Sequence, residues 1–215
     1  MHRLKSILVL LVVATLGAAT VAFAQDRDDD DRDRERKGDH RGGHGDNDDD
    51  DGRGEGRRGR FAAAKLINAE GDRVGRVFLK QRRRDREVVV FARVRDLPPG
   101  FHGFHIHTTG VCEPPAFTSA GGHYNPGGAQ HRDHAGDMPT LLVNQDGKGF
   151  VAFATDRFTV EELRAGDGSA VMVHELPDNY ANIPERYVGP NGPGPDAETR
   201  MTGDAGSRLA CGEVR

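Results

Sequence analysis

Histidines that could bind a metal are concentrated in one short stretch of the sequence. Within residues 100–112, GFHGFHIHTTGVC, three histidines fall within six positions, namely His102, His105 and His107. Side chains two residues apart in a β-strand point to the same face, so His105 and His107 would present two imidazoles side by side. Neutral imidazole suits copper, zinc, iron and nickel. His102 lies on the opposite side of that alternation from His105, and we expect it to have a separate role.

More side chains of the same kind follow further along the chain. The segment GGHYNPGGAQHRDHAGD contains His123, His131, His134 and Asp137, and the run SAVMVH ends in His174. Seven of the ten histidines therefore lie between positions 102 and 174. A single histidine is more often a structural residue, but seven of them together with an aspartate predict a metal site.

Short runs that favour β-strands surround these residues. They are FAAAKLINA, VGRVFLK, EVVVFARVR, FHGFHIH, TLLVN, FVAFAT and SAVMVHE, and turn sequences such as EGDR, DLPPG and QDGKG separate them. Several short strands with turn signals between them predict an all-β sandwich or barrel. The segment TVEELRAG could form one turn of helix. Two long irregular stretches, 108–139 and 176–207, interrupt the strands, and such loops in a compact domain are usually functional or disordered.

The N-terminal residues are typical of an export signal. Arg3 and Lys5 precede an apolar run over residues 7–24, which ends in the small-x-small pattern AFA. We therefore expect a signal peptide over residues 1–24 and a mature chain that begins at Gln25. Because the run is about long enough to span a bilayer, an uncleaved membrane anchor is the alternative.

The next segment differs in composition from the rest of the chain. Residues 25–60 contain no apolar residue after Gln25, and aspartate, arginine and glycine dominate them. Such a segment cannot bury enough surface to offset its ordering entropy, so we expect a disordered charged linker before a domain over residues 61–215. A weak metal-binding role for its His40 and His44 is the alternative to a solvated linker.

Charge and cysteine content limit the function further. The formal net charge of −4 gives no case for nucleic-acid binding. The two cysteines, Cys112 and Cys211, are expected to form one disulfide in an exported protein. Two free thiols or metal ligands are the alternative, although the sequence contains no CxxC pair.

Taken together, the motifs GFHGFHIH, GGHYNP, HRDHAGD, VMVHE and TGDAGSRLACG resemble those of the bacterial secreted Cu,Zn superoxide dismutases, in the same order, from about residue 61 to 214. The resemblance implies a Greek-key β-sandwich or flattened barrel of about eight antiparallel strands with two long functional loops. It implies copper and zinc as cofactors, and dismutation of superoxide to dioxygen and hydrogen peroxide at a histidine-bridged copper–zinc site. Such an antioxidant enzyme would work in the periplasm, the cell envelope or the extracellular space, and would protect the envelope from oxidative damage.

The resemblance also implies a role for each residue of the site. Copper would be bound by His105, His107, His123 and His174. Zinc would be bound by His123, His131, His134 and Asp137, so that His123 bridges the two metals through its two ring nitrogens. Asp178 would accept hydrogen bonds from His105 and His131 and fix both rings. His123 would supply a proton, and the guanidinium of Arg208 would attract and hold the superoxide anion.

Several parts around the site gain a role from the same resemblance. A disulfide between Cys112 and Cys211 would hold Arg208 in position relative to the first long loop. The second long loop would form a wall of the site, where family members use charges to guide superoxide. The candidates here are Glu185, Arg186, Asp196, Glu198, Arg200 and Asp204. Each of them could equally be an ordinary solvated residue.

Two features depart from the pattern of many relatives, and other functions stay open. The first is the short gap between His131 and His134. The second is that the chain stops four residues after Cys211, so a homodimer would need a surface other than a longer C-terminal strand. Membrane contact is expected only if the signal is uncleaved. The alternatives are a copper-binding or copper-delivering module on the same fold, and a structural or adhesive protein whose charged tail is the functional part.

Overall fold

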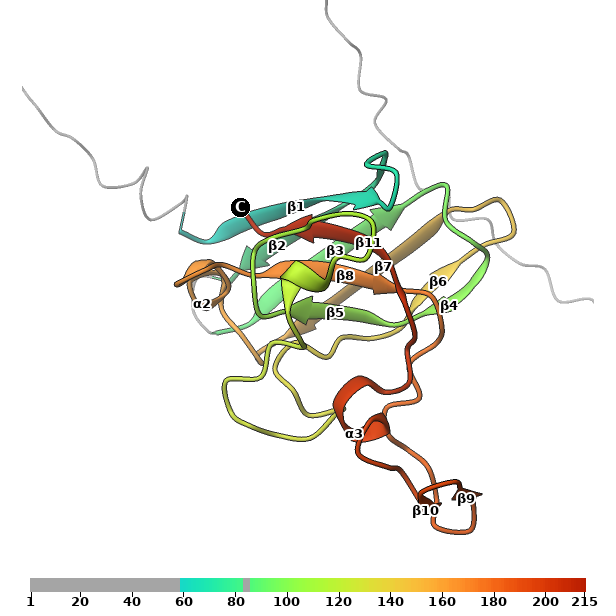
Figure 1. The fold of residues 1–215 in the computed structure, drawn as a ribbon. Coiled ribbons are helices and arrows are strands. Elements are labelled where there is room, and N and C mark those ends of the chain that lie inside the picture. The colour runs from blue at the N-terminus through green and yellow to red at the C-terminus, as the bar shows by residue number, and fades with distance from the viewer. Residues whose placement is uncertain (1–58, 83–85) are drawn as a thin grey trace, which may run out of the picture. The chain divides into compact units, whose positions relative to one another are not determined.

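The computed structural model describes residues 59–82 and 86–215 of the 215-residue chain (Figure 1). The expected signal peptide and residues 25–58 of the expected linker lie outside the described residues. Within the described part, no helix is long and apolar enough to cross a membrane.

The described part is built almost entirely from antiparallel strands. They are β1 (Phe61–Asn68), β2 (Arg73–Gln81), β3 (Val88–Val94), β4 (Gly100–His102), β5 (Phe104–His107), β6 (Leu141–Val143), β7 (Gly149–Thr155), β8 (Ala170–His174), β9 (Val188–Gly189), β10 (Gly192–Pro193) and β11 (Arg208–Glu213). The helices are short: η1 (Thr118–Ala120), α2 (Val160–Arg164) and α3 (Thr199–Thr202). All seven strand runs expected from the sequence are present, and the prediction of an all-β fold is confirmed.

Nine of the strands form one sheet that nearly closes into a barrel. Its order is β4-β6-β7-β3-β2-β1-β11-β8-β5. The two end strands, β4 and β5, are separated in sequence by Gly103 alone, so the two edges of the sheet meet at that residue. Non-consecutive neighbours such as β3 with β7 and β1 with β11 give the Greek-key connectivity. The expected number of about eight strands becomes nine because the run FHGFHIH is divided at Gly103.

Close packing explains why the residue between the two edge strands, β4 and β5, is a glycine. A Cβ on Gly103 would lie 2.7 Å from the Cβ of Ala205 and 3.3 Å from that of His174. The backbone of Gly103 also bonds to both sides of the junction, since its N–H donates to Leu176 O and its carbonyl accepts from His174 N, each at 2.8 Å. A larger residue would push β4 and β5 away from β8 and the loop that follows it.

Alternation along the strands places the core inside the barrel. In β1, for example, Ala62, Ala64 and Leu66 are buried while Phe61 and Lys65 are exposed. Strands β5 and β8, which carry histidines of the expected metal site, do not alternate in this way, since every one of their residues is buried. These two strands therefore offer buried side chains on both faces, one to the core and one to the long loops.

The short helix expected at TVEELRAG is confirmed as α2. The Thr159 side chain accepts a hydrogen bond from the N–H of Glu162, and the Glu162 carboxylate accepts one from the N–H of Thr159. This capping box satisfies two N-terminal donors at once, which stabilises a helix of only five residues.

The two long loops differ from one another. The first, residues 108–139, contains η1 as its only helix or strand. The second, residues 176–207, is less irregular than expected, because it contains the hairpin β9–β10 and the helix α3. The first loop follows the end of β5 and the second follows the end of β8, and the larger part of both lies below the barrel on the β5 side in Figure 1.

Candidate metal centre

Strands β5 and β8 place three histidines together. His105 and His107 lie on β5 and His174 ends β8, and the two strands pair with Phe104 opposite Val173 and His105 opposite Met172. The Nε2 atoms of His107 and His174 are 3.3 Å apart, and the ring centroids of His105 and His174 are 4.9 Å apart. All three side chains are buried.

The first long loop brings further ligands against β5. Its backbone pairs with the strand on both sides of Ile106, whose N–H donates to Gly136 O and whose carbonyl accepts from Tyr124 N. Isolated bridges in the same place join His105 to Asp137 and His107 to His123. As a result His123 lies 4.0 Å from His105 between ring centroids, although eighteen positions separate them in sequence.

Two clusters of four buried donors result, and they share His123. The first consists of His105, His107, His123 and His174, and the second of His123, His131, His134 and Asp137. Within each cluster one potential ligand atom per residue lies within 4.8 Å of all the others. Despite the short gap between them, His131 and His134 both reach Asp137, at 3.1 and 3.3 Å.

The hydrogen bonds of His105 and His131 show which ring nitrogen of each remains available to bind a metal. Nε2 of His105 donates to Asp178 Oδ2 at 2.8 Å, and Nε2 of His131 donates to Asp178 Oδ1 at 2.8 Å. The remaining Nδ1 atoms of both rings are buried and have no hydrogen-bond partner. An unpaired buried polar atom is costly, so two such nitrogens facing shared clusters of donors fit the binding of a cation.

The charges of the site differ between the two clusters. Burial lowers the pKa of His105 to about 4 and that of His174 to about 3, and holds the pKa of His107 well below its usual value. These rings are therefore neutral at physiological pH, as metal binding requires. Burial also opposes the charge on His131, but the nearby carboxylates of Asp137 and Asp178 outweigh it and raise the pKa of His131 to about 9.

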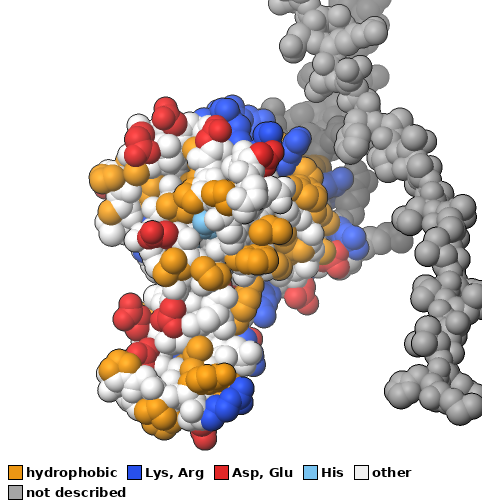
Figure 2. Space-filling view, turned by 90° about the vertical axis from the view of Figure 1, so that its right-hand side faces the viewer, with side chains coloured by type: hydrophobic (Ala, Val, Ile, Leu, Met, Phe, Trp, Pro, Cys, Tyr) orange, Lys and Arg blue, Asp and Glu red, His pale blue; other side chains and the backbone are white. Residues whose placement is uncertain are grey.

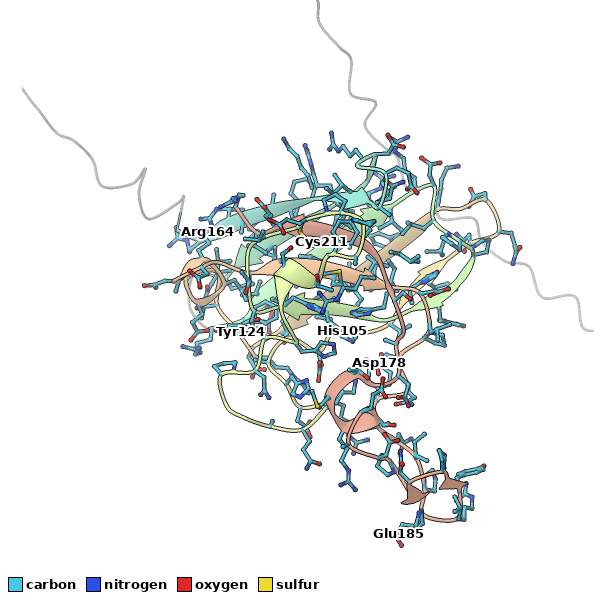
Figure 3. The ribbon with its side chains drawn as sticks, viewed as in Figure 1. His105, Tyr124, Arg164, Asp178, Glu185 and Cys211 are labelled. Atoms are coloured by element: carbon cyan, nitrogen blue, oxygen red, sulfur yellow. A yellow bond between two sulfur atoms is a disulfide. The ribbon has the colours of Figure 1, made fainter. Side chains whose placement is uncertain are left out.

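Asp178 joins the two clusters from the second long loop. Figure 3 shows it between His105 on the barrel and α3. Besides the two imidazoles, its Oδ1 accepts a hydrogen bond from Tyr180 N at 2.7 Å. Hydrogen bonds from His105 and His131 keep the pKa of this carboxyl below its usual range, although burial opposes them.

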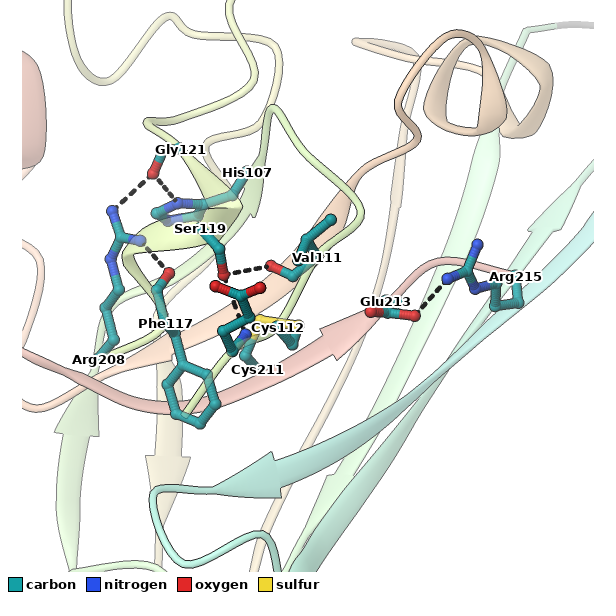
Figure 4. The surroundings of a disulfide bond; sticks show 11 residues. His107, Val111, Cys112, Phe117, Ser119, Gly121, Arg208, Cys211, Glu213 and Arg215 are labelled. Carbon is teal, nitrogen blue, oxygen red and sulfur yellow. Dashed lines mark hydrogen bonds and ion pairs between the residues drawn. A yellow bond between two sulfur atoms is a disulfide. The ribbon is translucent and has the colours of Figure 1, made fainter. Parts of the chain in front are cut away.

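Arg208 lies at the start of β11 and is held by the first long loop. Its two terminal nitrogens donate to the carbonyl oxygens of Phe117 and Gly121 (Figure 4). The Gly121 carbonyl also accepts from Nδ1 of His107 at 2.9 Å. One carbonyl thus fixes both the guanidinium and a histidine of the first cluster.

The disulfide lies close to these contacts of Arg208 (Figure 4). Cys112 and Cys211 are bonded, with Cα atoms 5.7 Å apart, so the expected pairing is confirmed. Cys211 is three residues after Arg208 on β11, and Cys112 is five residues before Phe117. The bond therefore ties the strand that carries Arg208 to the loop whose carbonyls hold it.

A pocket of about 590 Å³ opens onto the first cluster. Its wall includes His107, His123, His174 and Arg208, and both long loops contribute to it. Of the six charged candidates in the second loop, Arg200 lines this pocket. Asp196 instead accepts hydrogen bonds at the start of α3, from Thr199 N and Oγ1.

His102 has a different position from the other histidines of its segment. Its two ring nitrogens lie 2.8 Å from the carbonyl oxygens of His174 and Pro98. It belongs to neither four-donor cluster. The ring therefore packs behind β8 and links the backbone of His174 to the turn before β4.

Sequence reasoning missed the backbone groups that complete the site. The carbonyls of Phe117 and Gly121 hold Arg208, and Gly203 packs so closely that a Cβ there would lie 2.0 Å from Asp178 Oδ1. A carbonyl has no side-chain signature, so no sequence signal identifies the first two. Gly203 follows α3 with a φ of 61°, and a glycine after a helix is expected, but its contact with Asp178 depends on tertiary packing.

The fold and the two clusters define an all-β protein with buried, metal-binding histidines. The model of the family described as copper/zinc superoxide dismutase (SODC) matches residues 73–214. This match covers more than half of the chain, and the chain belongs to that family.

Individual relatives agree with this assignment. A superoxide dismutase [Cu-Zn] of Mycobacterium tuberculosis is 47% identical over 133 residues, which are 56% of this chain and 55% of the relative. Superoxide dismutase [Cu-Zn] 2 of Aquifex aeolicus is 33% identical over 166 residues, 72% of this chain and 86% of the relative. The chain spans about half the length of the mycobacterial relatives that it matches.

A solved structure shows the same fold. The crystal structure of a SOD-like protein from Bacillus subtilis has a TM-score of 0.57 and 29% sequence identity, and covers 71% of this chain and 97% of that protein. The similarity extends over nearly the whole of that chain.

Proposed function

We propose that this protein is an exported superoxide dismutase, which converts superoxide to dioxygen and hydrogen peroxide with bound copper and zinc. The observation that carries the proposal is the pair of buried four-donor clusters that share His123, one of which opens onto a pocket containing Arg208. Copper and zinc are the metals of the family, and imidazole nitrogen is a suitable ligand for both.

The first cluster has the composition expected of a copper site. His105, His107, His123 and His174 supply four imidazoles and no carboxylate. Hydrogen bonds occupy Nε2 of His105, Nδ1 of His107 and Nδ1 of His174, which leaves Nδ1, Nε2 and Nε2 of these rings for the metal. Each non-ligating nitrogen is thus bonded to a carboxylate or a carbonyl, as is usual for histidines that bind metals.

The second cluster has the composition expected of a closed zinc site. His123, His131, His134 and Asp137 make three nitrogens and one carboxylate, a set of four that suits tetrahedral zinc. Nδ1 of His123 lies 2.9 Å from Asp137 Oδ1 and 3.4 Å from Nδ1 of His134. Because Nδ1 of His123 faces this cluster, its Nε2 is the nitrogen left for the first cluster.

The protein side chains would bind superoxide and supply a proton for the formation of peroxide. Bound copper would supply the one-electron redox chemistry. The pocket admits a small anion, and Arg208 gives a fixed positive charge beside His107 and His174 at its wall. Peroxide formation needs protons, and Nε2 of His123 can hold one and release it while Nδ1 remains with the second cluster. The disulfide and the carbonyls of Phe117 and Gly121 keep the guanidinium in place during turnover.

The proposed domain organisation places this site in an exported protein. Residues 1–24 would be the signal peptide, 25–60 a charged linker and 61–215 the catalytic domain. The disulfide suits an oxidising compartment, and the periplasm, the cell envelope or the extracellular space would be the place of action.

A copper-binding module without fast turnover is the main alternative. The presence of both complete donor clusters and of Arg208 in the pocket disfavours it. An adhesive protein that acts through residues 25–60 is a further alternative, compatible with the first, and deletion of that segment would test it.

The test measures metal content and superoxide consumption on one sample. Residues 25–215 are expressed in an oxidising compartment and loaded with copper and zinc. About one copper and one zinc per chain, with fast superoxide consumption that is lost when copper is removed, is the expected result. Full copper with negligible consumption would favour the copper-binding module, and zinc without copper would contradict the assigned copper ligands.

A further inference from the structure

The outer surface of the barrel on the β1, β2, β3, β7, β6 and β4 side carries a group of exposed large apolar side chains. Phe61, Phe78, Phe101, Leu142 and Phe150 are between 43 and 58% exposed, and Phe91 lies among them. The ring of Phe91 is 6.4 Å from that of Phe78 and 5.0 Å from that of Phe150, between centroids. Figure 2 shows hydrophobic side chains grouped along one side of the barrel, with Lys and Arg side chains next to them.

Cations cross the same surface. Glu213 on the neighbouring strand β11 lines a pocket together with Lys65 and Arg76, but it forms its ion pair with Arg215. The sequences of these six strands contain no aspartate or glutamate, whereas Lys65, Arg76, Lys80 and Arg93 point outward from them. Lys65 is directly opposite Arg76 in the sheet register, and Arg76 is directly opposite Arg93. None of the four forms an ion pair with another described residue. We call the six apolar and four cationic residues named here the aromatic–basic face.

This register is unfavourable in the isolated protein. Like charges directly opposite one another on neighbouring strands destabilise a sheet, and here three cations lie in one row. The half-exposed phenylalanines add to this cost, because contiguous exposed apolar patches are uncommon on monomeric proteins and mark interaction sites. A partner that relieves both costs must offer negative charge and an apolar phase together.

Two simpler partners meet only one of these needs. A second copy of this face would cover the phenylalanines, but it would bring further cations and no acidic side chain of these six strands to the row. The chain's own acidic run at Asp48–Asp51 is close in sequence to β1 and could neutralise the cations, but residues 26–60 contain no apolar residue to cover the rings. An anionic phospholipid surface supplies phosphates and an apolar interior side by side.

We propose that the aromatic–basic face binds the surface of an anionic phospholipid membrane. Phe78, Phe101 and Phe150 would enter the boundary between headgroups and acyl chains, and the row Lys65, Arg76 and Arg93 would contact lipid phosphates. The metal-site pocket is lined by the long loops and by the ends of β5, β8 and β11, and contains none of these residues. Binding would therefore hold the protein at a membrane and leave the pocket free.

The test is sedimentation with vesicles of phosphatidylglycerol and phosphatidylcholine mixed, and of phosphatidylcholine alone. It uses the copper- and zinc-loaded chain from Gln25, which keeps every residue of the barrel and lacks the apolar run that would itself bind lipid. We expect binding to the mixed vesicles that is at least about tenfold tighter than to phosphatidylcholine, since each cation near an anionic surface contributes about fivefold.

Matched variants separate this face from general effects of charge and hydrophobicity. Arg93→Glu should weaken binding at least about tenfold, whereas Arg186→Glu, which makes the same change in net charge in the second loop, should not. The double variant Phe78→Ser and Phe150→Ser should also weaken binding at least about tenfold, whereas Tyr187→Ser with Val188→Ser, which removes exposed apolar side chains elsewhere, should not. Unchanged metal content in each variant shows that the protein is folded.

Three results would overturn the proposal. The first is equal binding to both kinds of vesicle, or none. The second is full binding by the phenylalanine double variant, which would mean that the cations alone attract polyanions. The third is evidence that something else covers the face. A change of oligomeric state in the same variants, measured by sedimentation without lipid, would mean that a second copy covers it. Lipid binding that appears only after residues 25–58 are deleted would mean that the chain's own acidic residues cover it.

Discussion

Asp178 and His131 are joined by hydrogen bonds of 2.8 and 3.0 Å, and the second oxygen of the same carboxylate accepts a hydrogen bond from His105 at 2.8 Å. One side chain of the second long loop therefore orients one histidine in each donor cluster. It also leaves Nδ1 of both rings free of hydrogen bonds. In the proposed site, this carboxylate would couple the positions of the two metals, as His123 would.

Replacing Asp178 should weaken both metal sites at once. Asp178→Asn keeps the size of the side chain but replaces one acceptor oxygen by an NH₂ group, which cannot accept from an imidazole N–H. We expect the affinity for copper and for zinc to fall about 10- to 100-fold, measured by competitive metal titration. Asp196→Asn, in the same loop but in contact with α3 rather than a histidine, is the control. Loss at only one site would contradict the coupling.

Gly203 should be required for the position of Asp178. An added Cβ would lie 2.0 Å from Asp178 Oδ1 and 2.4 Å from Nε2 of His131. Gly203→Ala should therefore displace the pair and reduce the content of both metals after purification. Gly71→Ala is the matched control, since Gly71 also has a positive φ but has nothing within 4 Å of its Cβ position. Both variants carry about 1 kcal/mol or more of backbone strain, so only the clash differs. Normal metal content in Gly203→Ala would show that this contact does not position Asp178.

Arg208 should affect turnover without affecting metal binding. Arg208→Ala removes the cation from the pocket, and we expect kcat/KM for superoxide to fall about tenfold or more with both metals retained, because a focused positive charge raises the association rate of an anion. Arg208→Lys keeps the charge but lacks the planar fork of two nitrogens that donates to Phe117 and Gly121, so an intermediate value is expected. Arg186→Ala, in the second loop outside the pocket, should match the native protein. The assigned role would be wrong if Arg208→Ala consumed superoxide at the native rate.

His105 and His102 should differ sharply although they are three residues apart. His105→Ala removes a donor of the first cluster, and copper and activity should be lost. His102→Ala leaves the cluster intact but removes the hydrogen bond that the neutral ring donates to one of the carbonyls of His174 and Pro98. We expect a lower free energy of unfolding, by about 1–3 kcal/mol, with copper retained. Metal analysis and denaturant unfolding measure the two effects, and equal, complete loss of copper in both variants would refute the difference.

Much of the barrel follows from local patterns in the sequence. Alternation and turn signals located β1, β2, β3, β6, β7 and β8, because these strands bury one or both faces. The hairpin β9–β10 had no such signal, since each strand is two residues long and they consist of Val-Gly and Gly-Pro, which have low strand propensity. The division of FHGFHIH into β4 and β5 was also missed, because it depends on the packing of Gly103 against Ala205 and His174.

Part of the site could also be predicted from the sequence. The spacing of His105 and His107 in a strand and the resemblance to a known family pointed to side chains that the structure brings into two clusters. Those two signals could not give the carbonyls that hold Arg208 or the contact of Gly203 with Asp178. These depend on where the two long loops lie, and the course of a long loop is set by tertiary contacts rather than by local propensity.

The most direct test of the central claim is anomalous X-ray diffraction from crystals of the metal-loaded protein, at the copper and zinc absorption edges. The account predicts a copper peak among His105, His107 and His174, a zinc peak among His131, His134 and Asp137, and the ring of His123 between them. A single mixed peak, or a copper peak outside the first cluster, would contradict the arrangement on which the proposed dismutase activity rests.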